Sequence, residues 1–270
     1  MPVRSVLFPV DFSPHCRLVT NVVADFARRF GAEVTVLHAL DLPPGAYADW
    51  IAFLNLVDLE NVKAHLRRQL EWFGREQFAG VDVRRVLVDG SAGPAIAEYA
   101  KTHGVDAVMM PTRGLNKFRE LLLGSVTAHV LHEAECPVWT EAHNAMEVEP
   151  AAEFRKILCA VDLSQASEGV FGWAKQVAAG YGAPLRVAHV IEKGGAEAEI
   201  SARQRWSAFA DGWDIEIRTG HVSEEICAAA KEHESDLVVI GRGAIRGKLG
   251  RFRSHAQAII RKSPCAVWSV

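Results

Sequence analysis

The chain has 270 residues, of which 49% are hydrophobic and 23% charged, and it carries a formal net charge of −3. This length exceeds the roughly 100 to 200 residues of a usual single domain, so two folded domains are expected. The small negative charge argues against nucleic acid as a partner. No apolar run reaches the roughly 20 residues of a spanning helix, and the first residues show no signal-peptide pattern, so we expect no membrane partner and a cytoplasmic location. The five cysteines are widely spaced without a CxxC pair, which predicts free thiols.

The first half of the chain alternates strand-like and helix-like segments. Arg4–Val10 is nearly all apolar, which is typical of a central parallel strand covered on both faces. Ser13 as N-cap and Pro14 at the first helical position predict a helix that ends at Gly31. This alternation continues and predicts a parallel sheet with helices on both faces. The later elements are expected as a strand at Glu33–Leu40, a long helix within Trp50–Phe78, a strand at Val81–Val88, a helix at Ser91–His103, a strand at Asp106–Met110, a helix at Ser125–Glu133 and a strand at Cys136–Thr140.

The second half of the chain repeats the first. Phe8–Ser13 recurs as Cys159–Ser164, 151 residues later, and Asp106–Met110 recurs as Asp236–Ile240, 130 residues later. Such stepped offsets are expected for a duplicated unit whose second copy has a shorter second helix. We therefore predict an α/β protein of two tandem domains, residues 1–143 and 154–270. Each is expected to be a doubly wound, Rossmann-like domain with a five-stranded parallel sheet.

An open parallel sheet binds ligands at the carboxyl ends of its strands. Two segments are predicted to lie there, Pro9–Asp11 at the end of the first strand and Pro111–Thr127 after the fourth. In the second segment, Gly114 and Gly124 allow a ligand to approach the backbone closely. The helix that begins at Ser125 directs free N–H groups and its positive dipole end to the same place, as a phosphate site requires. A serine at a helix start is equally well explained as an N-cap.

This segment resembles the nucleotide loop of the universal stress protein family, written G-x2-G-x9-G-[ST], with Pro111 in place of the first glycine. The residues that match the pattern are Gly114, Gly124 and Ser125. The opening Phe8–Asp11 and the closing Glu135–Val138 also resemble the first and last strands of that family. The resemblance covers essentially the whole chain. It implies the universal stress protein type of fold and bound ATP, with or without Mg²⁺.

The resemblance also implies where the nucleotide lies. Adenine is expected beside the first two strands, with a contact to the backbone of Ala39, the ribose near Asp11, and the phosphates over the glycine loop. A carboxylate suits ribose hydroxyls or Mg²⁺, although Asp11 is alternatively explained by an Asx turn before the helix. The implied nucleotide-binding residues are Pro9, Val10, Asp11, Ala39, Arg113, Gly114, Gly124, Ser125 and Val126.

The second repeat departs from this pattern. Its loop begins at Gly241–Gly243 and is one residue short, and Arg253–Ser254 stand where the first repeat has Gly124–Ser125. We expect its ATP site to be lost or remodelled, although Asp162 is present at the ribose position. The basic residues of this loop either bind an anion, a nucleotide held by the neighbouring repeat or nucleic acid, or they form a solvated charge run. They are Arg242, Arg246, Lys248, Arg251 and Arg253.

These observations favour a nucleotide-binding stress-response or signalling module. The sequence contains no Walker A motif and no evident pair of nucleophile and base, so no catalytic residue and no metal site is predicted. Two alternatives stay open: a slow ATPase or phosphotransfer enzyme, and a nucleotide-free interaction scaffold, which is favoured if Pro111 closes the loop. The family resemblance implies an intrachain pseudo-dimer through the last strands of the repeats, Cys136–Thr140 and Cys265–Ser269. A further homodimer of two chains stays open.

Overall fold

The computed structural model describes residues 2–41, 56–112, 123–142, 153–210, 212–242 and 251–270, and for 56–58 and 251–254 it describes the backbone alone. The chain divides into two compact units, Met1–Val138 and Trp139–Val270. The predicted domain limits at residues 143 and 154 adjoin a stretch outside the described residues and stay predictions. None of the helices in the described ranges is long and apolar enough to cross a bilayer.

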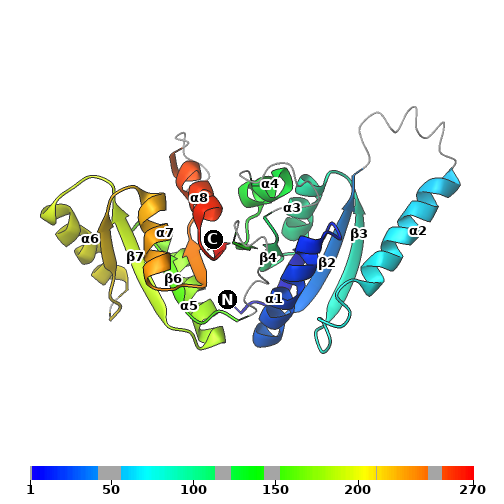
Figure 1. Cartoon of the computed structure of the whole chain (residues 1–270), viewed down its shortest axis with the longest axis horizontal. Helices are drawn as coiled ribbons and strands as arrows, with labels where there is room; N and C mark the ends of the chain where they lie inside the picture. The colour runs from blue at the N-terminus through cyan, green and yellow to red at the C-terminus, as the bar shows by residue number, and fades with distance from the viewer. Residues whose placement is uncertain (1, 42–55, 113–122, 143–152, 211, 243–250) are drawn as a thin grey trace. The chain divides into compact units, whose positions relative to one another are not determined.

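The first unit alternates strands and helices along the chain, as the blue-to-green ribbon of Figure 1 shows. Its strands lie in the order β3-β2-β1-β4-β5, and β1 pairs in parallel with β2 and β4, as β2 does with β3. The predicted doubly wound α/β class is therefore confirmed. The elements are β1 (Ser5–Pro9), α1 (Pro14–Phe30), β2 (Glu33–Leu40), α2 (Leu56–Trp72), β3 (Val83–Asp89), α3 (Ala92–Thr102), β4 (Ala107–Met110), α4 (Ser125–Glu133) and β5 (Val138–Thr140).

Helices cover both faces of the first sheet because successive side chains of a buried strand point to opposite faces. Leu7 of β1 packs with α3 and α4, in a cluster that contains Ile96 and Val130. Phe8, the next residue, packs on the other face, where its ring centroid lies 6.1 Å from that of Phe73 after α2. The side chains of Leu7 and Phe8 are fully buried. Each such burial stabilises the folded state by roughly 1.5 to 3 kcal/mol.

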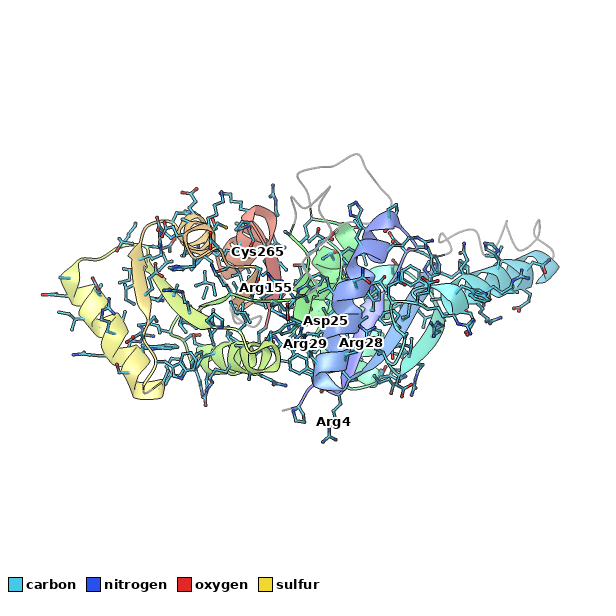
Figure 2. All side chains as sticks on the ribbon, turned by 60° about the horizontal axis from the view of Figure 1, so that its bottom comes forward. Arg4, Asp25, Arg28, Arg29, Arg155 and Cys265 are labelled. Atoms are coloured by element: carbon cyan, nitrogen blue, oxygen red, sulfur yellow. The ribbon has the colours of Figure 1, made fainter. Side chains whose placement is uncertain are left out.

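Helix α1 has the ends that the sequence predicts. The hydroxyl of Ser13 accepts a hydrogen bond from the N–H of Cys16 at 3.3 Å, and Gly31 ends the helix with a φ of 63°, in the left-handed region that glycine tolerates. Arg28, labelled in Figure 2 in the last turn, donates to the carbonyl oxygens of Gln77 and Ala79. These bonds tie the end of α1 to the segment that leads into β3.

A carboxylate closes the amino end of the sheet in each unit. Asp106 accepts hydrogen bonds from the N–H groups of Arg4 at 2.8 Å and Ser5 at 3.0 Å. Asp236 accepts from the N–H of Arg155 at 2.8 Å in the second unit. Arg4 and Arg155, both labelled in Figure 2, thus occupy equivalent positions. This amino edge lies opposite the carboxyl edge, where the sequence places the candidate ligand site.

The second unit repeats the architecture, with strand order β10-β9-β6-β7-β8. Its α6 has 14 residues against 17 in α2, in agreement with the predicted shorter second helix. The elements are β6 (Ile157–Ala160), α5 (Ser167–Tyr181), β7 (Leu185–Ile191), α6 (Ala196–Phe209), β8 (Glu216–Thr219), α7 (Val222–Glu232), β9 (Leu237–Ile240), α8 (Arg251–Lys262) and β10 (Ala266–Ser269).

Candidate functional site

The strand order of the first unit brings two loops together at its carboxyl edge. Strand β1 lies between β2 and β4, and the chain leaves β1 toward α1 on one face and leaves β4 toward α4 on the other. This is the topological switch point of a doubly wound sheet, where the loops diverge and leave room for a ligand. Val10–Phe12 and Pro111–Thr112 are the described residues that follow these two strands.

Asp11 is part of a tight turn between β1 and α1. Its Oδ1 accepts hydrogen bonds from the N–H of Ser13 at 2.9 Å and from the thiol of Cys16 at 3.0 Å. Burial raises the pKa of the Cys16 thiol, and the Asp11 carboxylate raises it further, so the thiol keeps its proton and donates it. Phe12 adopts a φ of 61°, which turns the chain sharply. The Asx turn considered for Asp11 is therefore present, and it leaves the half-buried carboxylate at the carboxyl edge.

The end of β2 presents backbone groups that the sheet does not use. The N–H of Val10 donates to the carbonyl of Leu37 at 2.8 Å, which is the last ladder bond between β1 and β2. Ala39 is the next residue whose N–H and C=O face β1, because these groups alternate in direction along a strand. No hydrogen bond joins either group to another described residue. Ala39 therefore offers a donor and an acceptor side by side, next to Asp11.

His38 accounts for part of this arrangement. Its Nδ1 lies 2.7 Å from the carbonyl oxygen of Val10, and because a carbonyl only accepts, Nδ1 must carry the proton. The next ladder bond would run from the N–H of Ala39 to that same oxygen, which the imidazole already engages. The ring also lies 4.6 Å, centroid to centroid, from the ring of Phe12. His38 was not predicted as a site residue, although its recurrence as His189 was visible in the repeat.

Hydrogen bonds near both ends of the second loop hold its base together. The N–H of Gly124 donates to the carbonyl of Thr112 at 3.0 Å. The buried hydroxyl of Thr127 donates to the carbonyl of Pro111 at 3.1 Å. The loop therefore leaves and rejoins the domain at one place, beside the end of β4. Thr127 was not predicted to have a role, because only the folded loop brings it to Pro111.

Gly124, and not Ser125, is the N-cap of α4. Ser125 is the first helical residue and its side chain is exposed, so the explanation of Ser125 as a capping serine is wrong. The N–H groups of the first helical turn have no partner within the helix and carry its partial positive charge. Gly124 has φ −57° and ψ 143°, a conformation open to every residue type, so the backbone shape alone does not demand glycine here.

The structure places the expected site residues in two groups at the carboxyl edge. Pro9 ends β1, and Val10 and Asp11 follow it beside Ala39 of β2. Gly124 caps α4, which begins with Ser125 and Val126. Ala39 and Val126 pack against the same apolar cluster under α3 and α4, which links the two groups. Arg113 and Gly114 lie outside the described residues. Across the described ranges, no three His, Cys, Asp or Glu side chains are placed to hold a metal ion.

This fold and edge define a doubly wound α/β protein whose candidate site lies at the switch point of its first unit. A family model described as the universal stress protein family matches residues 2–140, 153–211 and 193–270. The chain belongs to the universal stress protein family, as its motifs predicted, and it carries the family domain in tandem.

Individual relatives agree with this assignment. A universal stress protein of Thermus aquaticus is 31% identical over 138 residues, which are 50% of this chain and 96% of that one. A universal stress protein of Methanocaldococcus jannaschii is 26% identical over 149 residues, which are 50% of this chain and 92% of that one. The crystal structure of a universal stress protein from Archaeoglobus fulgidus shares the fold over 99% of this chain and 96% of its own, with a TM-score of 0.69 and 24% identity.

Proposed function

We propose that the first unit is an adenine-nucleotide-binding stress-response module and that ATP is its ligand. The observation that carries this proposal is the pair of backbone groups on Ala39, which lies beside Asp11 and shares an apolar cluster with the start of α4. A nucleotide needs an edge for its base, an acceptor for its ribose and a positive site for its phosphates. The described residues supply each of these at one edge of the sheet.

The base is proposed to pair with Ala39. The Watson–Crick edge of adenine presents an N6 amino donor beside the N1 acceptor, which complements a backbone C=O beside an N–H. The partly buried side chains of Ala39 and Val126 offer an apolar surface to the ring. Asp11 keeps one carboxylate oxygen in its turn, and the carboxylate is proposed to accept hydrogen bonds from the ribose hydroxyls.

The phosphates are proposed to lie at the start of α4, where the first N–H groups of the helix bind anions. Pro111 does not remove a donor from this part of the site. It is buried, and its carbonyl accepts from Thr127, so it belongs to the base of the loop. The residues present fit ATP; any Mg²⁺ would be held mainly by phosphate oxygens and water.

Slow ATP turnover is a second candidate function, because a bound triphosphate at a helix start is already partly positioned for transfer. Single-turnover phosphate release with excess protein tests it. Release that is faster in the wild type than in a variant unable to bind ATP would support turnover. Equal release from both would leave a binding module.

Calorimetric titration with ATP tests the proposed function, using the wild type, Gly124→Arg and the matched control Gly124→Ala. Both variants should fold, because the backbone conformation at Gly124 suits any residue. We expect one ATP per chain in the wild type, a small loss in the alanine variant, and a loss on the order of a hundredfold in the arginine variant, whose side chain fills the phosphate position. Equal affinities in all three, or no binding by the wild type, would contradict the proposal.

We also propose a cytoplasmic location, which the five free cysteines support because free thiols are typical of reducing compartments. Pairing of the two units through their last strands, and dimerisation of whole chains, stay predictions from the sequence. Analytical ultracentrifugation of the purified chain measures its oligomeric state directly.

A further inference from the structure

The second unit repeats the backbone geometry that is proposed to bind adenine in the first unit. The N–H of Val161 donates to the carbonyl of Ala188 at 3.0 Å, and Nδ1 of His189 donates to the carbonyl of Val161 at 2.8 Å. The matching distances in the first unit are 2.8 and 2.7 Å. Val190 therefore takes the place of Ala39, and its N–H and C=O likewise have no hydrogen-bond partner in the part of the chain that the structure describes.

The turn at the ribose position is also repeated. Oδ1 of Asp162 accepts from the N–H of Ser164 at 2.9 Å and from the hydroxyl of Ser167 at 2.8 Å. Leu163 has a φ of 57°, close to the value at Phe12. Burial opposes the ionisation of Asp162, but the hydrogen bonds from both serines outweigh it and lower its pKa. The second unit thus offers an ionised carboxylate at the same place relative to its strands.

The phosphate side has changed. Helix α8 begins at Arg251, three residues before Ser254, whereas α4 begins at the matching Ser125. As the fourth residue of its helix, Ser254 is the first whose N–H is bonded within the helix, so that amide is no longer available to an anion. The contact that closes the loop in the first unit is missing as well, because Ala256 stands at the position of Thr127 and has no hydroxyl to donate.

Polar side chains have replaced the apolar surface beside the base. His255 stands at the position of Val126, and its ring centroid lies 5.5 Å from that of His221. Nε2 of His255 lies 3.7 Å from a carboxylate oxygen of Glu192, which follows β7. Imidazole and carboxylate groups exchange hydrogen bonds with hydroxyl groups. This edge of the second unit therefore suits a hydroxyl-bearing ligand rather than a polyphosphate.

We infer that the second unit binds a purine nucleoside in preference to a nucleoside triphosphate. The base pairs with the backbone of Val190, and the ribose hydroxyls meet Asp162 and the imidazole of His255. The inference rests on the proposed function, because the first unit supplies the geometry for comparison. The two units then respond to different adenine compounds within one chain.

Calorimetric titration of the full-length Gly124→Arg protein, whose first unit has lost its proposed phosphate position, tests the inference with adenosine and ATP as probes. We expect one adenosine per chain and an affinity for ATP at least tenfold lower. Asp162→Asn in the same background should weaken adenosine binding about tenfold. The amide oxygen can still accept from Ser164 and Ser167, so the turn and the fold should persist, as circular dichroism would show.

A matched change in the first unit serves as the control. Asp11→Asn in the otherwise wild-type chain should weaken ATP binding, and in the Gly124→Arg background it should lower the adenosine affinity much less than Asp162→Asn does. The inference is overturned if the Gly124→Arg protein binds neither probe, if it binds ATP as tightly as adenosine, or if Asp162→Asn has no effect. Should the wild type bind ATP while the Gly124→Arg protein binds no adenosine, the proposed function stands and this inference alone fails. Absence of ATP binding in the wild type would instead count against the proposed function.

Discussion

At the residue scale, the position of His38 shows how one side chain prepares a backbone site. Its Nδ1–H engages the carbonyl of Val10 at 2.7 Å, and the same contact occurs at His189 with 2.8 Å. In both units the hydrogen bonds to the first strand stop before this histidine, and within the described ranges the N–H and C=O of the next residue have no partner. The side chain thus acts through Val10 on the backbone that we propose to meet the base.

His38→Phe should weaken ATP binding about fivefold. Phenylalanine preserves the ring beside Phe12 but has no N–H, so the carbonyl of Val10 becomes free to accept from Ala39; one net hydrogen bond of about 1 kcal/mol corresponds to this change. Calorimetry measures it. His189→Phe is the control and should not alter ATP binding in the first unit. Wild-type affinity in a folded His38→Phe protein would refute this role.

The roles of single residues were predicted correctly where they depend only on nearby backbone. Ser13 caps α1 and Gly31 ends it, because both depend only on neighbouring backbone. The alternative explanation of Ser125 as an N-cap was wrong, since Gly124 caps α4. The hydrogen bonds of His38 and Thr127 could not be predicted, because they join residues that only strand register and loop closure bring together.

At the scale of elements, the start of α4 combines loop closure with the proposed phosphate site, and two variants separate these roles. Thr127→Val removes the donor to the buried carbonyl of Pro111 and should lower the free energy of unfolding by about 1 to 2 kcal/mol. The same variant should also bind ATP more weakly. Ser125→Ala changes an exposed hydroxyl and should change stability by less than about 0.5 kcal/mol while weakening ATP binding. Urea unfolding and calorimetry measure the two effects. Equal stability loss in both variants would disprove the separation.

Element boundaries followed the sequence where its signals were strong. The predicted strand Glu33–Leu40 and helix Ser125–Glu133 have the bounds found in the structure. The last strand of the first unit begins at Val138 rather than Cys136, because Pro137 has no N–H to donate. Helix α8 begins before Ser254, since arginine favours a helix where the first unit has glycine.

At the scale of the whole molecule, the two units share a fold but stabilise it differently. Arg218 of β8 forms ion pairs with Glu216 at 2.7 Å, Glu225 at 2.9 Å and Glu232 at 2.8 Å, and only 16% of its side chain is exposed. The matching residue of the first unit is Val88. The duplication could be predicted from the repeated motifs. The ion pairs of Arg218 could not, because the residues that form them belong to no motif shared with the first repeat.

Arg218→Val should destabilise the second unit by about 1 to 2 kcal/mol at neutral pH, because it removes charged hydrogen bonds and leaves three carboxylates close together. Burial raises the pKa of Glu216, but His233 and Arg218 lower it overall, and Arg218 lowers that of Glu232. A carboxylate with a lowered pKa stabilises the fold at pH values above its ordinary pKa of 4.5, and this stability is lost as the pH falls through the lowered pKa. The difference between variant and wild type should therefore shrink in acid.

Urea unfolding followed by tryptophan fluorescence checks this pH dependence, since four of the seven tryptophans, Trp173, Trp206, Trp213 and Trp268, lie among the elements of the second unit. Lys101→Met removes an exposed ion pair with Glu135 and serves as the control, with little change expected at any pH. A destabilisation by Arg218→Val that is the same at neutral and acidic pH would show that the network does not act through its charges.

The central claim is that ATP binds to the first unit through the end of β2 and the start of α4. Hydrogen–deuterium exchange of the wild-type chain, with and without saturating ATP, tests it most directly. The amide of Ala39 has no partner in the described structure and should exchange rapidly until ATP is added. We predict that ATP slows exchange at Ala39 and at Ser125–Val126, with little change at Val190. Unchanged exchange at those residues, or equal protection at Val190, would contradict the account.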